Sequence, residues 1–191
     1  MHTVGKGRGD NLRLQRQRGN GQSLMHSRGR GNGGDVVGFC QAGPGDLLET
    51  GWPGKAYDAD ASQATYTKVL EEGAERLDVT LHIQKARLRN HPTADAFLAD
   101  ALAQQADGIF LINMDGHVYG VQAMHRVLDT RGDRTLPMLI FVPHGTLHAK
   151  PRVYERFRQA PHCFAAASAD VGWLADGLRL LKSRWQMAHT R

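Results

Sequence analysis

The sequence has only two cysteines, Cys40 and Cys163, among its 191 residues. A small domain held together by disulfides needs several cysteine pairs, so that class is excluded. No apolar run approaches the roughly 20 residues that a membrane-spanning helix requires, so we expect no membrane partner. Hydrophobic residues make up 41% and charged residues 23% of the chain. This composition is typical of a soluble globular domain.

Large apolar residues are scarce in residues 1–34, which contain 9 of the 22 glycines. Such a segment cannot bury enough apolar surface to offset the entropy that it would lose on ordering. We therefore predict a disordered Arg/Gly-rich tail over residues 1–34. This segment also lacks the apolar run of a secretory signal and a paired arginine. We expect a cytoplasmic location.

Negative charge is nearly absent from the same tail, in which seven basic residues face Asp10 alone. The net charge of the tail is therefore +6. Because the formal net charge of the whole chain is +5, residues 35–191 carry a net charge of −1. Any attraction for a polyanion is expected from the tail only. Interleaved Arg and Gly residues can follow a phosphate backbone, so non-specific RNA binding through the tail is an alternative function. The tail has no aromatic residue for base stacking, so we expect such binding to be weak.

From residue 35 onward, short apolar runs alternate with segments of helical period. The apolar runs predict strands over residues 36–40, 79–83, 109–112, 138–142 and 163–167. The periodic segments predict helices over residues 62–77, 93–106, 118–128, 152–157 and 170–185, with Thr93 and Asp170 as caps. This alternation predicts one α/β domain over residues 35–191. We expect a Rossmann-like or flavodoxin-like three-layer sandwich with a five-stranded parallel sheet in the order 2-1-3-4-5.

Polar residues gather where the predicted strands end. Ligands of open parallel sheets bind beyond the carboxyl ends of the strands, near the reversal in strand order. The long loop over residues 41–61 adds an aromatic candidate, because long loops in compact domains often bind ligands. The candidate substrate-binding residues are Gln41, Trp52, Asn113, Asp115, His117, His144, Thr146 and His148.

Catalytic, cofactor and metal motifs are weak or missing. Gly43-Pro44-Gly45 lacks the third glycine of a dinucleotide fingerprint and predicts a turn. His144 and His148 have the spacing of two ligands on one helix, but Gly145 and Pro151 argue against a helix there. Both cysteines fall in predicted strands, where cysteine is usually a small buried hydrophobe. We predict no catalytic residue, no metal ligand and no cofactor held by this chain.

Four stretches occur in a definite order along the chain. They are Gly51-Trp52-Pro53-Gly54 with Tyr57-Asp58, residues 106–112, residues 140–146 and residues 170–182. In order and spacing, over about 150 residues, they resemble the amino-terminal region of the L-fucose/L-arabinose isomerase-like sugar isomerases. The resemblance implies a Rossmann-like first domain, a small sugar or polyol as ligand, and homo-oligomers in which first domains help frame neighbouring active sites. It implies a divalent metal such as manganese only for a full-length isomerase.

One departure from that family limits what is carried over. The family's metal-binding glutamate, aspartate and histidine come from a later portion of the chain, and this sequence stops where that portion would begin. We therefore expect an amino-terminal domain or fragment, with a carbohydrate-binding or structural role, that does not isomerise sugars alone. A regulatory module is a further hypothesis, because this fold serves many functions. A phosphoacceptor receiver is disfavoured, because the first predicted strand ends in Phe39-Cys40-Gln41 and not in an acidic pair. Asp115, after the third strand, therefore lacks acidic partners.

Overall fold

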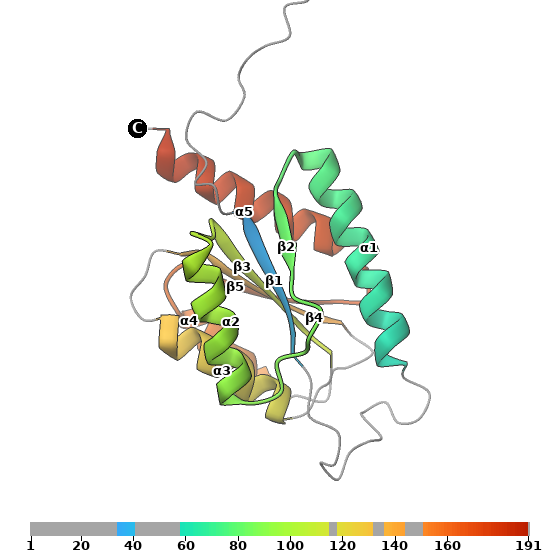
Figure 1. Cartoon of the computed structure of the whole chain (residues 1–191), viewed down its shortest axis with the longest axis vertical. Helices are drawn as coiled ribbons and strands as arrows, with labels where there is room; N and C mark the ends of the chain where they lie inside the picture. The colour runs from blue at the N-terminus through green and yellow to red at the C-terminus, as the bar shows by residue number, and fades with distance from the viewer. Residues whose placement is uncertain (1–33, 41–57, 115–117, 132–135, 144–150, 191) are drawn as a thin grey trace, which may run out of the picture.

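The computed structural model describes residues 34–40, 58–114, 118–131, 136–143 and 151–190. Within these ranges five strands alternate with five helices (Figure 1). The strands are β1 (Asp35–Cys40), β2 (Leu81–Ile83), β3 (Gly108–Asn113), β4 (Met138–Pro143) and β5 (Cys163–Ser168). The helices are α1 (Ala59–Leu77), α2 (His91–Ala103), α3 (Val118–Arg131), α4 (Pro151–Gln159) and α5 (Trp173–His189). The predicted tail, apart from Gly34, lies outside the described residues.

All neighbouring strands of the sheet run parallel, in the order β2-β1-β3-β4-β5. This confirms the predicted fold class and strand order. The register aligns Asp35 with Gly108 and Met138 with Cys163. The strands therefore begin along one edge of the sheet and end along the opposite edge, where candidate ligand-binding residues are expected.

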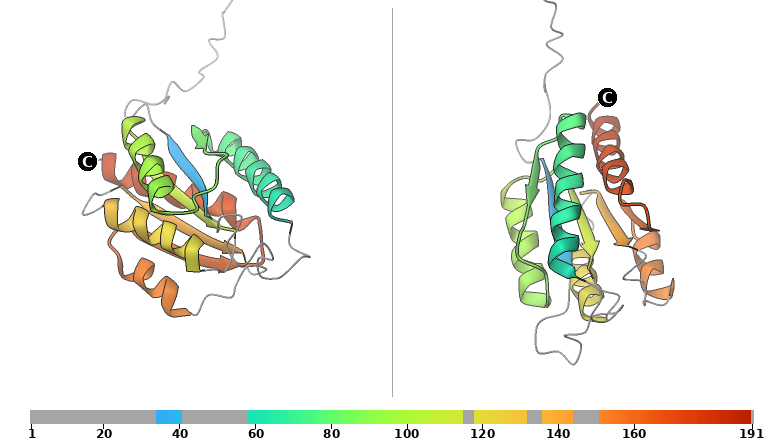
Figure 2. Two further views of the ribbon diagram at one scale, coloured as in Figure 1. Left: turned by 60° about the horizontal axis from the view of Figure 1, so that its bottom comes forward. Right: turned by 90° about the vertical axis from the view of Figure 1, so that its right-hand side faces the viewer.

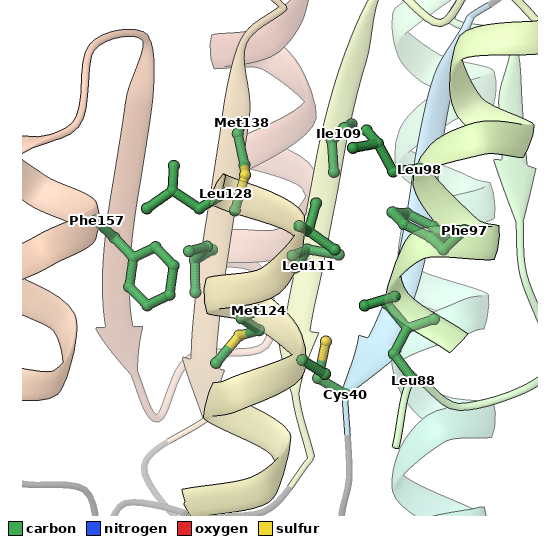
Figure 3. Close-up of a cluster of buried hydrophobic side chains, with 14 of the residues drawn as sticks. Cys40, Leu88, Phe97, Leu98, Ile109, Leu111, Met124, Leu128, Met138 and Phe157 are labelled. Carbon is green, nitrogen blue, oxygen red and sulfur yellow. The ribbon is translucent and has the colours of Figure 1, made fainter. Parts of the chain in front are cut away.

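Two helical layers cover the sheet (Figure 2). Helices α2, α3 and α4 lie on one face, where Phe97, Met124 and Phe157 pack against the sheet (Figure 3). Helices α1 and α5 cover the other face. Because successive strand residues point to opposite faces, both faces of a central strand become buried. This explains the continuous apolar runs that predicted the central strands.

The structure corrects two predicted caps. Asn90, and not Thr93, is the N-cap of α2: its side-chain oxygen accepts from the Thr93 N–H at 3.0 Å. The Thr93 hydroxyl oxygen accepts from the Asn90 N–H at 3.1 Å, which completes a capping box. Helix α5 begins at Trp173 with Gly172 as its N-cap, and the Asp170 carboxylate instead accepts from the Gly172 N–H at 2.8 Å. Asp170 therefore stabilises the preceding turn.

A buried arginine lies at the edge of the sheet where the strands begin. Arg131, at the end of α3, is 2% exposed and donates to the carbonyl oxygens of Leu136 and Pro161. These carbonyls precede β4 and β5, so one guanidinium connects α3 to both strand beginnings. Burial lowers the pKa of Arg131. Arg131 therefore has a structural role, because its guanidinium donates to main-chain carbonyl oxygens.

An ion pair joins α2 to α3. Arg126 Nε donates to Asp95 Oδ1 at 2.7 Å, and its Nη2 donates to Oδ2 at 2.9 Å. The hydrogen bonds from Arg126 lower the pKa of Asp95, although partial burial opposes the shift. A lowered pKa in the folded state means that the pair contributes stability above the unfolded-state value of about 3.9. That contribution is lost as the pH falls through the lowered folded-state value.

We therefore expect Asp95→Asn to reduce the free energy of unfolding more at pH 7 than at an acid pH at which Asp95 is protonated. The reason is that a protonated Asp95 resembles asparagine in shape and charge. Urea unfolding of both proteins at several pH values measures the difference. Asp100→Asn, an exposed change on the same helix, is the control. An Asp95→Asn effect that is equal at both pH values would contradict the assignment.

Candidate functional site

The carboxyl edge of the sheet is the candidate site. The strand order reverses between β1 and β3, since the chain proceeds from β1 to β2 on one side and from β3 to β5 on the other. Open parallel sheets bind ligands at such a reversal. Cys40 and Asn113, the last residues of β1 and β3, are register partners. The Met114 N–H donates to the Cys40 carbonyl oxygen at 2.8 Å, so the strands stay paired to their ends.

Asn113 is the one predicted site residue that falls within the described ranges. Its side chain is fully buried, and its Nδ2 donates to the Tyr154 hydroxyl oxygen at 2.9 Å. Tyr154 lies in α4, is 7% exposed, and has its ring centroid 6.4 Å from that of Phe157. The bond therefore fixes the end of β3 to the helix that follows β4. A buried amide without such bonding would destabilise the fold.

The other seven predicted site residues lie outside the described residues, so the structure does not bring them together or separate them. They are Gln41, Trp52, Asp115, His117, His144, Thr146 and His148. Three of them, His144, Thr146 and His148, belong to the connection from β4 to α4. The bond between Asn113 and Tyr154 involves the helix at the end of that connection.

An aromatic residue that the sequence analysis did not select lies just beyond β5. Trp173, the first residue of α5, is partly exposed and stacks on Phe141 of β4, with centroids 5.4 Å apart and planes inclined by 10°. The intervening turn is held by a bond from the Asp170 N–H to the Ser168 hydroxyl oxygen at 3.0 Å. The carboxyl-end rule would have included Trp173 had it been extended to the first turn of the following helix. Tyr154 gave no such signal, because it lies within a helix.

Metal-ligating side chains do not cluster in the part of the chain that the structure describes. No group of three or more His, Cys, Asp or Glu residues there is arranged to hold a metal ion. The acidic and histidine candidates after β3 and β4 are outside those ranges. Among the described helices, none combines the length and apolar character needed to cross a bilayer.

Both cysteines are buried. Cys40 is fully buried and Cys163 is 7% exposed. Burial raises the pKa of the Cys163 thiol to about 11, while the Arg131 guanidinium pulls it in the opposite direction. The thiol is therefore protonated at neutral pH, and a protonated thiol is a poor nucleophile. This confirms the prediction that the cysteines are small buried hydrophobes.

Folded protein is accordingly expected to leave both thiols unmodified by a thiol-reactive disulfide reagent at pH 7.5. The two thiols should both react in concentrated guanidinium chloride, because unfolding removes their burial. Absorbance of the released thiolate measures the reaction. Rapid modification of either thiol in folded protein would show that the strand ends open readily.

Comparison with known proteins adds no relative: no family model, no curated protein and no solved structure matches this chain. A functional proposal therefore depends on the carboxyl edge and on the residues around it.

Proposed function

We propose that this chain is the first domain of a sugar-isomerase-like protein and binds a small sugar or polyol beyond the carboxyl ends of β1, β3 and β4. The observation that carries the proposal is the buried hydrogen bond from Asn113 to Tyr154 at the reversal in strand order. Burying two polar side chains is unfavourable unless they bond to each other. At this edge the pair connects β3 to α4, the helix that follows His144, Thr146 and His148 in the sequence.

The aromatic residue at the same edge supports a carbohydrate ligand. The Trp173 indole is partly exposed and is held by its stack on Phe141. Sugars present apolar C–H faces that pack on aromatic rings, while their hydroxyl groups take up hydrogen bonds. Small-molecule sites commonly combine apolar walls with a few polar groups in this way. In this proposal, the aldose–ketose step and its divalent metal belong to residues outside this chain.

Isothermal calorimetry of the full chain against a panel of pentoses, hexoses and their polyols tests the proposal. We expect saturable heat with at least one sugar. Tyr154→Phe should weaken that binding several-fold and lower the free energy of unfolding by about 1 kcal/mol, because it removes the hydroxyl that accepts from Asn113. The matched control is Tyr66→Phe, which changes an equally buried tyrosine (7% exposed) on the opposite layer. Folded protein that gives no heat with any sugar would refute the proposal.

The charge distribution favours a second candidate, non-specific RNA binding through residues 1–34. Seven basic residues in that segment contrast with a net charge of −1 over residues 35–191. Fluorescence anisotropy with single-stranded RNA should show binding that weakens steeply between low and moderate salt. Replacing the seven basic residues by serine within the full chain should abolish it. Equal binding by both proteins would exclude this candidate.

A further inference from the structure

Exposed apolar surface is concentrated at one edge of the fold. Within the described ranges, the large hydrophobic residues that stand exposed are Phe164 (45%), Leu180 (48%) and Met187 (64%). Phe164 belongs to β5, which is the edge strand beside β4, and the other two belong to α5. Exposed apolar patches on a folded domain frequently mark contact surfaces.

Helix α5 uses its opposite flank to pack against the rest of the domain. Leu174, Leu178 and Leu181 are buried on the sheet, and a Cβ on Gly73 of α1 would lie 3.1 Å from the Ala175 Cβ. In Figure 2, α5 lies with α1 on the face of the sheet opposite α2. The outward residues of α5 therefore lie on the solvent side of the helix.

Four outward residues of α5 form a narrow stripe. Asp176, Leu180, Arg184 and Met187 are all exposed. At 3.6 residues per turn they fall within about 80° of the helix circumference. Arg184 Nη2 bonds to His162 Nδ1 at 2.8 Å, which directs this flank toward the start of β5, two residues before Phe164. The stripe and Phe164 therefore lie on the same side of the domain.

We propose that this stripe is the interface between two copies of the chain, related by a two-fold axis that brings their α5 helices together antiparallel. In a two-fold interface, residue i contacts residue j of the partner, and j contacts i. The stripe has that symmetry about Leu180. Asp176 and Arg184 each lie four residues from Leu180, so reversal sets opposite charges against each other twice. Met187 lies seven residues beyond Leu180 and extends the apolar surface at each end of the pair.

Charge complementarity is the reason to choose a second copy as the occupant. An antiparallel copy sets Asp176 of each chain against Arg184 of the other, in addition to the bonds that these side chains make to Arg179 and His162, whereas an unrelated partner would need its own matching pattern. Asp176 already receives a bond from Arg179 at 2.6 Å, so its carboxylate is held on the surface. Exposed charge pairs contribute modestly to affinity and mainly fix the relative orientation. Leu180 at the centre is expected to contribute most of the apolar contact.

Sedimentation velocity of the full chain over a concentration series tests the proposal. We expect a reversible dimer that Leu180→Glu converts to monomer, with an unchanged circular dichroism spectrum because Leu180 is exposed. Asp176→Arg and Arg184→Asp should each weaken the dimer by about tenfold, and the two changes together should restore it. Lys68→Glu, an exposed change on α1, is the control and should have no effect.

A crosslink gives a second measurement. Leu180 lies on the proposed axis, so Leu180→Cys should form a disulfide-linked dimer on mild oxidation. Glu155→Cys, on exposed α4 surface, should not. A wild-type chain that stays monomeric at all concentrations would overturn the proposal. So would a dimer that survives Leu180→Glu, or charge changes that fail to restore association when combined.

Discussion

Phe97→Ala is expected to lower the free energy of unfolding by about 3–5 kcal/mol, enough to unfold much of a marginally stable domain. Phe97 is fully buried between α2 and the sheet. Its ring lies so close to β1 that a Cβ on Gly38 would be only 2.9 Å from Phe97 Cε2. Alanine would leave a cavity that the rigid strand cannot fill, so both the lost burial and the cavity destabilise the fold.

Urea unfolding followed by circular dichroism measures this loss. The matched control is Phe164→Ala, in which the same side chain is removed from an edge strand where it is 45% exposed. That change should cost much less, because most of the Phe164 ring already faces solvent. Equal losses for the two variants would mean that the α2 layer is not packed as described.

Gly177→Val is expected to destabilise the domain by about 1–3 kcal/mol through overpacking on the opposite face of the sheet. A Cβ at position 177 would lie 2.9 Å from Phe110 Cε1 and 3.2 Å from Trp173 Cζ3. Phe110 is fully buried in a central strand and has no free space to move into. Valine is more favourable than glycine within a helix by only about a few tenths of a kcal/mol. The steric cost of the substitution is therefore larger than its gain in helix propensity.

The contact between Gly177 and Phe110 can be isolated with a double-mutant cycle. Adding Phe110→Leu to Gly177→Val should cost less than Phe110→Leu costs in the wild-type background, because the smaller side chain relieves the clash. Ser183→Val, at an exposed position of α5, is the control and should be nearly neutral. Strict additivity of the two changes would contradict the close approach of α5 to the sheet.

The architecture could be predicted from the sequence because the signals of neighbouring elements agreed. Residues 109–112 and 138–142 are apolar without interruption, and in the structure every one of them is buried in a central strand. Such runs leave no polar face for solvent, which favours a parallel sheet covered on both sides. Because crossover connections between parallel strands are right-handed, helices can cover both faces only if the strand order reverses.

The ends of elements were less predictable, because they depend on individual main-chain bonds. Residue 79 was assigned to the second strand, but the Val79 N–H donates to the Ala74 carbonyl oxygen at 2.9 Å and so terminates α1. Asp78 makes this possible by adopting a left-handed conformation with φ of 50°. Likewise α2 ends at Ala103 and not at residue 106 as predicted, because Gln105 adopts a left-handed conformation with φ of 54°.

Among the predicted site residues, Asn113 was predictable in its position at the end of a strand and not in its contacts. The carboxyl-end rule selected Asn113 from its place directly after a buried strand. Its bond to Tyr154 joins residues 41 positions apart, and no local pattern indicates that the two meet. Trp173 was missed for a different reason, since the helix was expected to begin before it.

The position of β1 has a consequence for synthesis. Although β1 is synthesised before the other described strands, it lies in the interior of the sheet, between β2 and β3. The backbone groups of β1 on one side can form sheet hydrogen bonds only after Leu81–Ile83 has been synthesised. Those on the other side need Gly108–Asn113. A nascent chain shorter than this therefore presents an apolar strand with both edges open, the kind of species that chaperones recognise.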